Sequence, residues 1–278
     1  MKRIVEVEFK AGRREFYHID NDLEFSPNQY VVVEAERGIN LGKVIQYITV
    51  NQEEEAIDYN DLFSIIRVAN DDDLKKLDKI HKKERRASVI FQDRLLRFPI
   101  ELFLVDTEYQ FDGNRVTFYF TAGGRVDFRE FVRDLASIFK TRIELRQINP
   151  REEARRLGGI GVCGREYCCT IFKKNSVQVT LQMAKDQNLT TNLSKISGPC
   201  GRLLCCLSFE ENFYLDIADK FPSIGTEIEY NYKKVKVMKN HYLTNNVRVR
   251  TQENVDIVIP LEEFRKAEKT TAYCHKDT

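Results

Sequence analysis

The sequence lacks any run of apolar residues long enough to cross a membrane. A membrane-spanning helix needs about 18 to 20 consecutive apolar residues, and no stretch of this 278-residue chain approaches that length. The first residues alternate charged and apolar side chains, so they also lack the uninterrupted apolar centre of a signal peptide. We therefore expect no membrane insertion and a cytoplasmic location.

The chain also has almost no net charge. Its 44 Lys and Arg residues are balanced by 43 Asp and Glu residues, which leaves a formal net charge of +1. This balance argues against a protein whose whole surface coats nucleic acid, although it is compatible with a local basic patch. The basic run 81–86 could contact RNA phosphates. It lies in a predicted helix whose other face is apolar, so a solvated helix face is the preferred interpretation.

Signals for catalysis are absent as well. The sequence shows no Ser-His-Asp arrangement and no pair of carboxylates that spacing marks as a general acid and base. The glycine-rich segment 157–161 resembles a phosphate-binding loop, but the Lys-Ser/Thr of a P-loop does not follow it. We interpret it as a flexible approach to the cysteines that come next.

What the sequence does contain is seven cysteines, six of which form a repeated pattern. Disulfides are rare in the cytoplasm, so cysteines there indicate metal binding or catalysis. Residues 163–169 read CGREYCC, and residues 200–206 read CGRLLCC. Both copies begin with Cys-Gly-Arg, end with Cys-Cys, and are followed three residues later by Phe172 or Phe209. The seventh cysteine, Cys274, stands alone near a polar tail and is interpreted as a bystander.

The repeated pattern predicts a metal site made of thiolates. Four residues separate Cys163 from Cys168, the gap found in the first ligand pair of plant-type iron–sulfur proteins. Structural zinc usually uses close cysteine pairs, often together with histidine. The histidines all lie far from the cysteines in the sequence, at His18, His81, His241 and His275. An all-thiolate site suits an iron–sulfur cluster or zinc.

Neighbouring residue types favour the iron–sulfur cluster. Arg165 and Arg202 would offset the negative charge of a four-thiolate cluster. Gly164 and Gly201 would let backbone N–H groups approach the sulfur atoms. Zinc remains the alternative metal. The explanation without a metal is that the cysteines are buried and act only as small core residues.

The preferred ligands are Cys163, Cys168, Cys200 and Cys205. Adjacent residues point about 100° apart on a helix, so both members of a Cys-Cys pair hardly serve one small cluster. Cys169 and Cys206 are therefore interpreted as core residues, as substitute ligands, or as donors to a cluster shared with a partner.

The expected fold class is α+β, in five segments. We expect an N-terminal small β domain at 1–62, a ferredoxin-like domain at 63–149, a helical cysteine-rich metal-cluster segment at 150–219, a C-terminal small β-barrel at 220–265 and a flexible tail at 266–278. The N-terminal segment is also expected to form a small β-barrel or sheet, because its apolar residues alternate with charges.

The segment 63–149 has the clearest pattern. A helix is predicted after Asn70 or Asp71, either of which could cap it, with an apolar stripe that recurs at steps near 3.6 residues. A hairpin turn is predicted at Asp112-Gly113, and Asp127 with Glu130 predicts a capping box for a second helix. The predicted strands are 64–68, 100–109, 115–120 and 142–146. The resulting order, β-α-β-β-α-β, is that of the split βαβ or ferredoxin-like arrangement.

Several longer motifs resemble the bacterial YaaT/RicT-like family. These are LGGIGVCGR at 157–165, the Cys-Cys pair at 168–169, MAKDQNL at 183–189 and KISGPCGRLLCC at 195–206. The preceding β-α-β-β-α-β region resembles the domain shared with the C-terminus of a fungal polymerase-suppressor protein. The resemblance covers nearly the whole chain and is densest between 157 and 209.

This resemblance implies a regulatory subunit and not an enzyme in its own right. It implies assembly with two small helical partner proteins and adjustment of a membrane-tethered endoribonuclease during mRNA maturation. Effects on sporulation, competence and biofilm formation would follow, and direct contact with RNA is compatible with this role. It also implies [4Fe-4S] clusters, whose cysteines fall on Cys163, Cys168, Cys169, Cys200, Cys205 and Cys206.

Two other classes of function stay open. One is a zinc-stabilised RNA-binding module built from the two small barrels. The other is a cluster-dependent redox or electron-transfer protein, for which a second redox group would be expected. The sequence shows no nucleotide-binding fingerprint for such a group.

Overall fold

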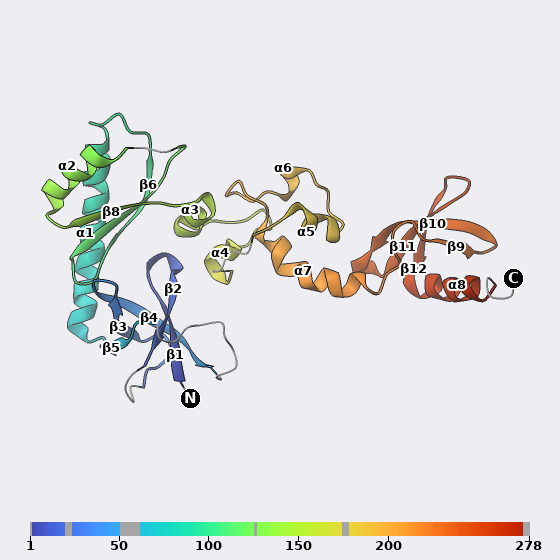
Figure 1. Cartoon of the computed structure of the whole chain (residues 1–278), viewed down its shortest axis with the longest axis horizontal. Helices are drawn as coiled ribbons and strands as arrows, with labels where there is room; N and C mark the ends of the chain where they lie inside the picture. Colours follow the sequence, from blue (N-terminus) through green and yellow to red (C-terminus); the bar gives the residue numbers. More distant parts are fainter. Residues whose placement is uncertain (1, 20–23, 51–61, 125–126, 174–177, 275–278) are drawn as a thin grey trace. The chain divides into compact units, whose positions relative to one another are not determined.

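The computed structural model describes residues 2–19, 24–50, 62–124, 127–173 and 178–274. The chain divides into two compact units, Met1–Ser176 and Val177–Thr278. Figure 1 shows the first unit in blue to yellow-green and the second in yellow to red. The boundary falls inside the predicted cysteine-rich segment, so that the two copies of the repeat belong to different units.

The first unit begins with a five-stranded antiparallel sheet in the order β2-β1-β4-β3-β5. Its strands are β1 (Lys2–Glu8), β2 (Arg14–His18), β3 (Tyr30–Ala35), β4 (Gly38–Val50) and β5 (Ile65–Val68). The alternation seen in the sequence places Val5 and Val7 in the core, where both are fully buried. Gly42 of β4 is needed there, because a Cβ at this position would lie 2.4 Å from the Val7 side chain.

This sheet is not the closed barrel that alternation alone allowed. Among the described residues, a single bridge joins the edge strand β2 at His18 to Ser64, the residue before the other edge strand, β5. A closed barrel requires a continuous ladder between the first and last strands. The segment is therefore an open sheet that curls around one core.

A second, three-stranded sheet follows in the order β6-β7-β8. Its strands are β6 (Phe103–Tyr109), β7 (Arg115–Thr121) and β8 (Arg142–Gln147), and the helices with it are α1 (Asp71–Leu95) and α2 (Arg129–Phe139). α1 and α2 cover one face of the sheet (Figure 1). Their contact is aromatic: the Phe91 ring lies 4.6 Å from that of Phe118 and 4.9 Å from that of Phe131, centroid to centroid.

The predicted order of elements is present, but the ferredoxin-like sheet is not. β5 pairs with β3 of the N-terminal sheet and not with β6, β7 or β8. β7 and β8 are adjacent and parallel, whereas a split βαβ places another strand between them. The physical reason is that Ile65 of β5 is buried in the N-terminal core, beside Val33.

The first unit ends with two short helices, α3 (Pro150–Leu157) and α4 (Cys168–Ile171). Asn149 caps α3, because its side chain accepts from the backbone N–H groups of Arg151 and Glu152. Pro150 occupies the first turn, where its missing N–H costs nothing.

The second unit combines short helices with a four-stranded antiparallel sheet in the order β12-β11-β10-β9. Its helices are α5 (Leu181–Asp186), α6 (Leu193–Ile196), α7 (Cys205–Ala218) and α8 (Leu261–Cys274), and its strands are β9 (Glu227–Tyr230), β10 (Lys233–His241), β11 (Asn246–Thr251) and β12 (Asp256–Pro260). Phe264 of α8 is fully buried against Val237 and Val249 of the sheet. The predicted C-terminal barrel is thus, over the residues described, an open sheet with one helix across it. No described helix is both long and apolar enough to span a bilayer.

Candidate functional site

The first cysteine loop, residues 159–169, is a tight hairpin that leads into a helix. Its backbone hydrogen bonds run from Gly161 N–H to Arg165 O, from Gly164 N–H to Gly161 O and from Tyr167 N–H to Gly159 O, at 2.8, 3.0 and 3.0 Å. Cys163 therefore lies at the tip of the turn. Gly164 follows it with φ of +78°, a conformation that glycine adopts without steric cost. α4 begins at Cys168.

The second cysteine loop, residues 196–206, repeats this backbone. Its hydrogen bonds run from Gly198 N–H to Arg202 O, from Gly201 N–H to Gly198 O and from Leu204 N–H to Ile196 O, at 2.8, 2.9 and 2.9 Å. Gly201 has φ of +70°, and α7 begins at Cys205. The residues before the two helices also match, with φ −56° and ψ 129° at Tyr167 and φ −56° and ψ 123° at Leu204. The repeat in sequence is thus a repeat in structure.

The six cysteines differ in accessibility. Cys163 is exposed, Cys168, Cys200, Cys205 and Cys206 are half-buried, and Cys169 is buried. Within each loop the first cysteine lies in the hairpin turn and the second starts the helix. Both turns also carry a glycine against the sulfur: a Cβ at Gly161 would lie 3.5 Å from Cys163 Sγ, and one at Gly198 would lie 3.8 Å from Cys200 Sγ.

The donor set fits a soft metal or a cluster, while a closed coordination shell is not formed by the described side chains. Thiolates are the ligands of iron–sulfur clusters and of all-sulfur zinc sites. No three Cys, His, Asp or Glu side chains among the described residues gather closely enough to hold a metal ion. Arg165 and Arg202 are exposed and make no ion pair with a described residue, so their charges face outward beside the two turns.

Exposed apolar side chains surround both loops. Near the first loop Leu157 is 67% exposed and Val162 is 77% exposed, and near the second Phe213 is 53% exposed. The phenylalanines that follow the two Cys-Cys pairs, Phe172 and Phe209, are 50% and 61% exposed. Large apolar side chains exposed beside a candidate site are typical of surfaces that take part in protein association.

α3 fixes the chain that enters the first cysteine loop. The Arg156 side chain is only 2% exposed, and its Nη1 donates to Asp106 Oδ2 at 3.0 Å. The guanidinium carbon lies 3.5 Å from the ring centroid of Tyr119, which places the cation on the aromatic face. A buried arginine thus ties α3 to the three-stranded sheet, on the face opposite to α1 and α2.

Asp106 also joins this arginine to the N-terminal sheet. Lys10 Nζ donates to Asp106 Oδ1 at 2.7 Å, to Glu84 Oε2 at 3.0 Å and to Thr107 O at 2.6 Å. Burial by itself would lower the pKa of Lys10, but the carboxylates of Asp106 and Glu84 outweigh it and hold the pKa above its ordinary value. Burial raises the pKa of Glu84, although Lys10 opposes that shift.

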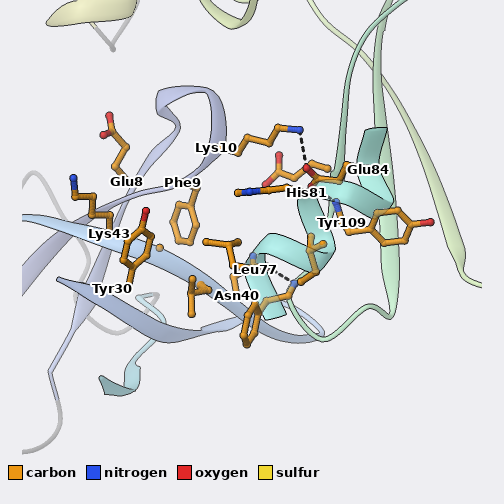
Figure 2. A pocket seen from close by; sticks show the side chains of 15 residues that line it. Glu8, Phe9, Lys10, Tyr30, Asn40, Lys43, Leu77, His81, Glu84 and Tyr109 are labelled. Atoms are coloured by element: carbon orange, nitrogen blue, oxygen red, sulfur yellow. Dashed lines mark hydrogen bonds and ion pairs between the residues drawn. The ribbon is translucent and has the colours of Figure 1, made fainter. Parts of the chain in front are cut away.

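A cavity of about 300 Å³ lies beside this ion network. Figure 2 shows Phe9 and Leu77 facing each other across it, with Lys10 bonded to Glu84 at one side and Lys43 and Tyr30 at the other. Three acceptors already occupy the Lys10 ammonium, so this lysine is structural and is not available as a nucleophile. No local sequence pattern indicates this network, because its members are scattered from residue 10 to residue 156.

Comparisons with known proteins agree on one family. Residues 63–148 match the family described as PSP1 C-terminal conserved region, and residues 178–221 match the family described as PSP1-like protein, third domain. The second cysteine loop lies within the latter range, and the first lies outside both.

Two curated relatives are similar to this chain. The stage 0 sporulation protein YaaT of Bacillus subtilis is 43% identical over 249 residues, which cover 90% of each chain. An uncharacterized protein of Schizosaccharomyces pombe is 33% identical over a region that covers 49% of this chain and 22% of the yeast protein. No solved structure matches the chain.

Proposed function

The chain belongs to the YaaT-like family of proteins with PSP1 domains, and from this premise we propose that it is a cytoplasmic regulatory adaptor that binds an iron–sulfur cluster. In this role it acts in sporulation and related development, assembles with two small helical partner proteins, and modulates endoribonuclease-dependent mRNA processing. It performs no catalysis itself. The sporulation role is suggested by the name of the Bacillus subtilis relative.

The observation that carries the proposal is the structural duplication of the cysteine loops. Each loop presents a cysteine in a glycine turn and a second cysteine at the first residue of a helix. A glycine beside the sulfur leaves room for a bound cluster, whose negative charge nearby backbone N–H groups would stabilise. We assign Cys163, Cys168, Cys200 and Cys205 as the cluster ligands. Together they would hold one [4Fe-4S] cluster. Zinc is the competing occupant of this site.

The apolar surface around the loops supports the adaptor part of the proposal. Val162 lies in the first loop and Phe172 follows it, while Phe209 and Phe213 follow the second loop. All four are at least half exposed. A partner that packs on these side chains would remove them from water, and each Å² of apolar surface buried contributes roughly 25 cal/mol. Metal binding that orders the loops would then also order this surface.

Anaerobic purification tests the cluster directly. We expect a brown protein with a broad thiolate-to-iron absorption band near about 400 nm, and iron and sulfide in equal amounts. A colourless anaerobic preparation with stoichiometric zinc would replace the cluster by a zinc site. A preparation that contains neither iron nor zinc at a stoichiometric level would overturn the proposal.

Single cysteine-to-serine variants separate ligands from their neighbours. Serine is close to cysteine in size but is a poor ligand for a soft site. Cys163→Ser, Cys168→Ser, Cys200→Ser and Cys205→Ser should each lose iron, whereas Cys169→Ser should cost about 1–3 kcal/mol of stability and keep it. Cys274→Ser is the matched control and should behave as the parent does.

Partner capture links the cluster to assembly. The fraction of protein recovered with its partners should follow the iron content across the serine variants. If every iron-free variant still captures its partners, the cluster is not an assembly element. If Cys206→Ser keeps iron and loses the partners, this second cysteine of the pair faces the interface and the ligand assignment stands.

A further inference from the structure

The outward face of α1 carries many positive charges, although the chain as a whole is nearly neutral. No other described helix carries as many exposed cations. Between residues 75 and 86 there are seven Lys or Arg side chains, all exposed, and two acids. The seven are Lys75, Lys76, Lys79, Lys82, Lys83, Arg85 and Arg86. One of the two acids, Glu84, is buried and bonded to Lys10, so Asp78 is the only exposed acid of this segment.

Three of the seven cations already have a partner in the fold. Lys75 pairs with Asp72 at 3.1 Å. Lys76 lies 4.4 Å from the ring centroid of Phe111, and Lys83 lies 4.1 Å from that of Tyr109. The other four make no ion pair with any residue in the described part of the chain. We call these four, Lys79, Lys82, Arg85 and Arg86, the α1 basic patch.

The patch is not arranged as an ordinary solvated helix face. Residues three and four apart on a helix are neighbours, and like charges at this spacing destabilise it. Lys82 has Lys79 three residues before it, and Arg85 and Arg86 three and four residues after it. Solvated faces usually alternate signs to avoid such repulsion. An anion bound along the patch would remove the repulsion.

We propose that the α1 basic patch binds the phosphate backbone of RNA. With a rise of about 1.5 Å per residue, Lys79, Lys82 and Arg86 line one side of the helix over about 10 Å, which is enough to contact successive phosphates of one strand. Lys and Arg contacts of this kind position a nucleic acid without reading its sequence. The choice of RNA rests on the proposed role in mRNA processing.

A membrane surface is the less favoured occupant. A helix that binds a bilayer interface inserts an apolar face beneath the lipid headgroups. The apolar side chains that α1 would need, among them Ile80, Ala87 and Phe91, are buried in the core of the first unit. Contact with anionic lipid would therefore be purely electrostatic.

The test measures RNA affinity of the full-length protein as a function of salt. Fluorescence anisotropy with a labelled single-stranded RNA of about 20 nucleotides would compare the parent with a variant that carries K79Q, K82Q, R85Q and R86Q. Loss of four phosphate contacts should reduce the slope of log K against log salt by about 3, and weaken binding at 0.1 M salt at least tenfold.

The matched control removes the same charge from another exposed surface of the first unit. R129Q, R133Q, K140Q and R142Q together give the same net charge on and after α2 and should leave both affinity and slope near the parent values. Equal weakening in the two variants, or none in either, would overturn the proposal. So would tighter binding to DNA of the same sequence, or to vesicles with anionic lipid.

Iron content separates this inference from the proposed function. Cys163→Ser protein should lose its cluster and keep the patch-dependent RNA affinity. If the parent binds its cluster and partners but the patch variant loses no RNA affinity, the patch proposal alone fails. If the patch variant loses RNA affinity while the parent holds no cluster, the adaptor proposal alone fails. Circular dichroism of both quadruple variants should match the parent, since every changed side chain is exposed.

Discussion

At the scale of single residues, Tyr119 reports on the junction between the three-stranded sheet and α3. Its ring lies beneath the Arg156 guanidinium, and its hydroxyl donates to Glu108 Oε2 at 3.1 Å. Burial, and then the negative charge of Glu108, raise the pKa of Tyr119 to about 12. Because the folded pKa lies above the ordinary value near 10, the group contributes stability below pH 10 and loses that contribution as pH rises towards 12.

We predict that phenolate absorbance will show a high-pH step to which Tyr119 contributes. Tyr109, whose pKa burial also raises to about 12, contributes to the same step. Tyr119→Phe should reduce the step and lower the free energy of unfolding at pH 7 by about 1 kcal/mol, through loss of one hydrogen bond. Tyr232→Phe, at a ring that is 98% exposed, is the control and should leave the free energy of unfolding unchanged. A full step in Tyr119→Phe would contradict the assignment.

Some of the residues described above can be predicted from the sequence alone, and others cannot. The cysteine repeat can be recognised in the sequence because its members are close along the chain and the pattern occurs twice. The sequence does not predict the ion network of Lys10, Glu84 and Asp106, because each is an ordinary charged residue until the fold brings the three together. The ion network depends on tertiary pairing, for which a single sequence carries no local signal.

At the scale of elements, α3 couples the three-stranded sheet to the first cysteine loop. Arg156→Met keeps the helix and most of the side-chain volume but leaves the carboxylate of Asp106 with only Lys10 as a charged partner. Breaking a buried ion pair in this way costs about 3–5 kcal/mol. We expect faster hydrogen exchange across 150–169, measured by mass spectrometry, and unchanged exchange in β9 to β12.

Arg155→Met is the control for this change. Arg155 is also on α3, but its contact with Glu152 is longer, at 3.8 Å, and its side chain is more exposed, at 18%. It should loosen the loop far less. If the two variants increase exchange equally, α3 is held by its backbone and caps, and the arginine on the Tyr119 ring is not the anchor.

Local signals predicted individual elements well and their pairing poorly. Of the two predicted caps of α1, the structure selects Asn70, and its partner in the capping box is Asp73. The box expected at Asp127 and Glu130 is wrong: α2 starts after Phe128, and Asp127 accepts from the backbone N–H of Arg129 and pairs with its guanidinium. The position of β5 in the chain is predicted correctly. A four-residue strand does not specify its partner, and the burial of Ile65 determines the pairing with β3.

At the scale of the whole molecule, each compact unit has hydrophobic clusters made of its own residues. Those of the first unit centre on Phe91, Phe118 and Phe131 and on the buried valines of the N-terminal sheet. Those of the second unit are built around Val237, Val249 and Phe264 and around Ala184. Domains with separate cores usually open as separate cooperative units.

We therefore predict that, in protein without a bound cluster, core truncations act on one unit at a time. Phe264→Ala removes a side chain with no exposed surface and should cost the second unit about 3–5 kcal/mol. Native-state hydrogen exchange should then rise in β10 and β11 and stay unchanged in β7. Phe118→Ala, equally buried in the first unit, is the reciprocal variant and should raise exchange in β7 while β10 and β11 keep theirs. Exchange that rises in both units after either change would mean that the chain unfolds as one cooperative body. The two cysteine loops would then share a single unfolding equilibrium, so a change in the core of either unit would loosen both.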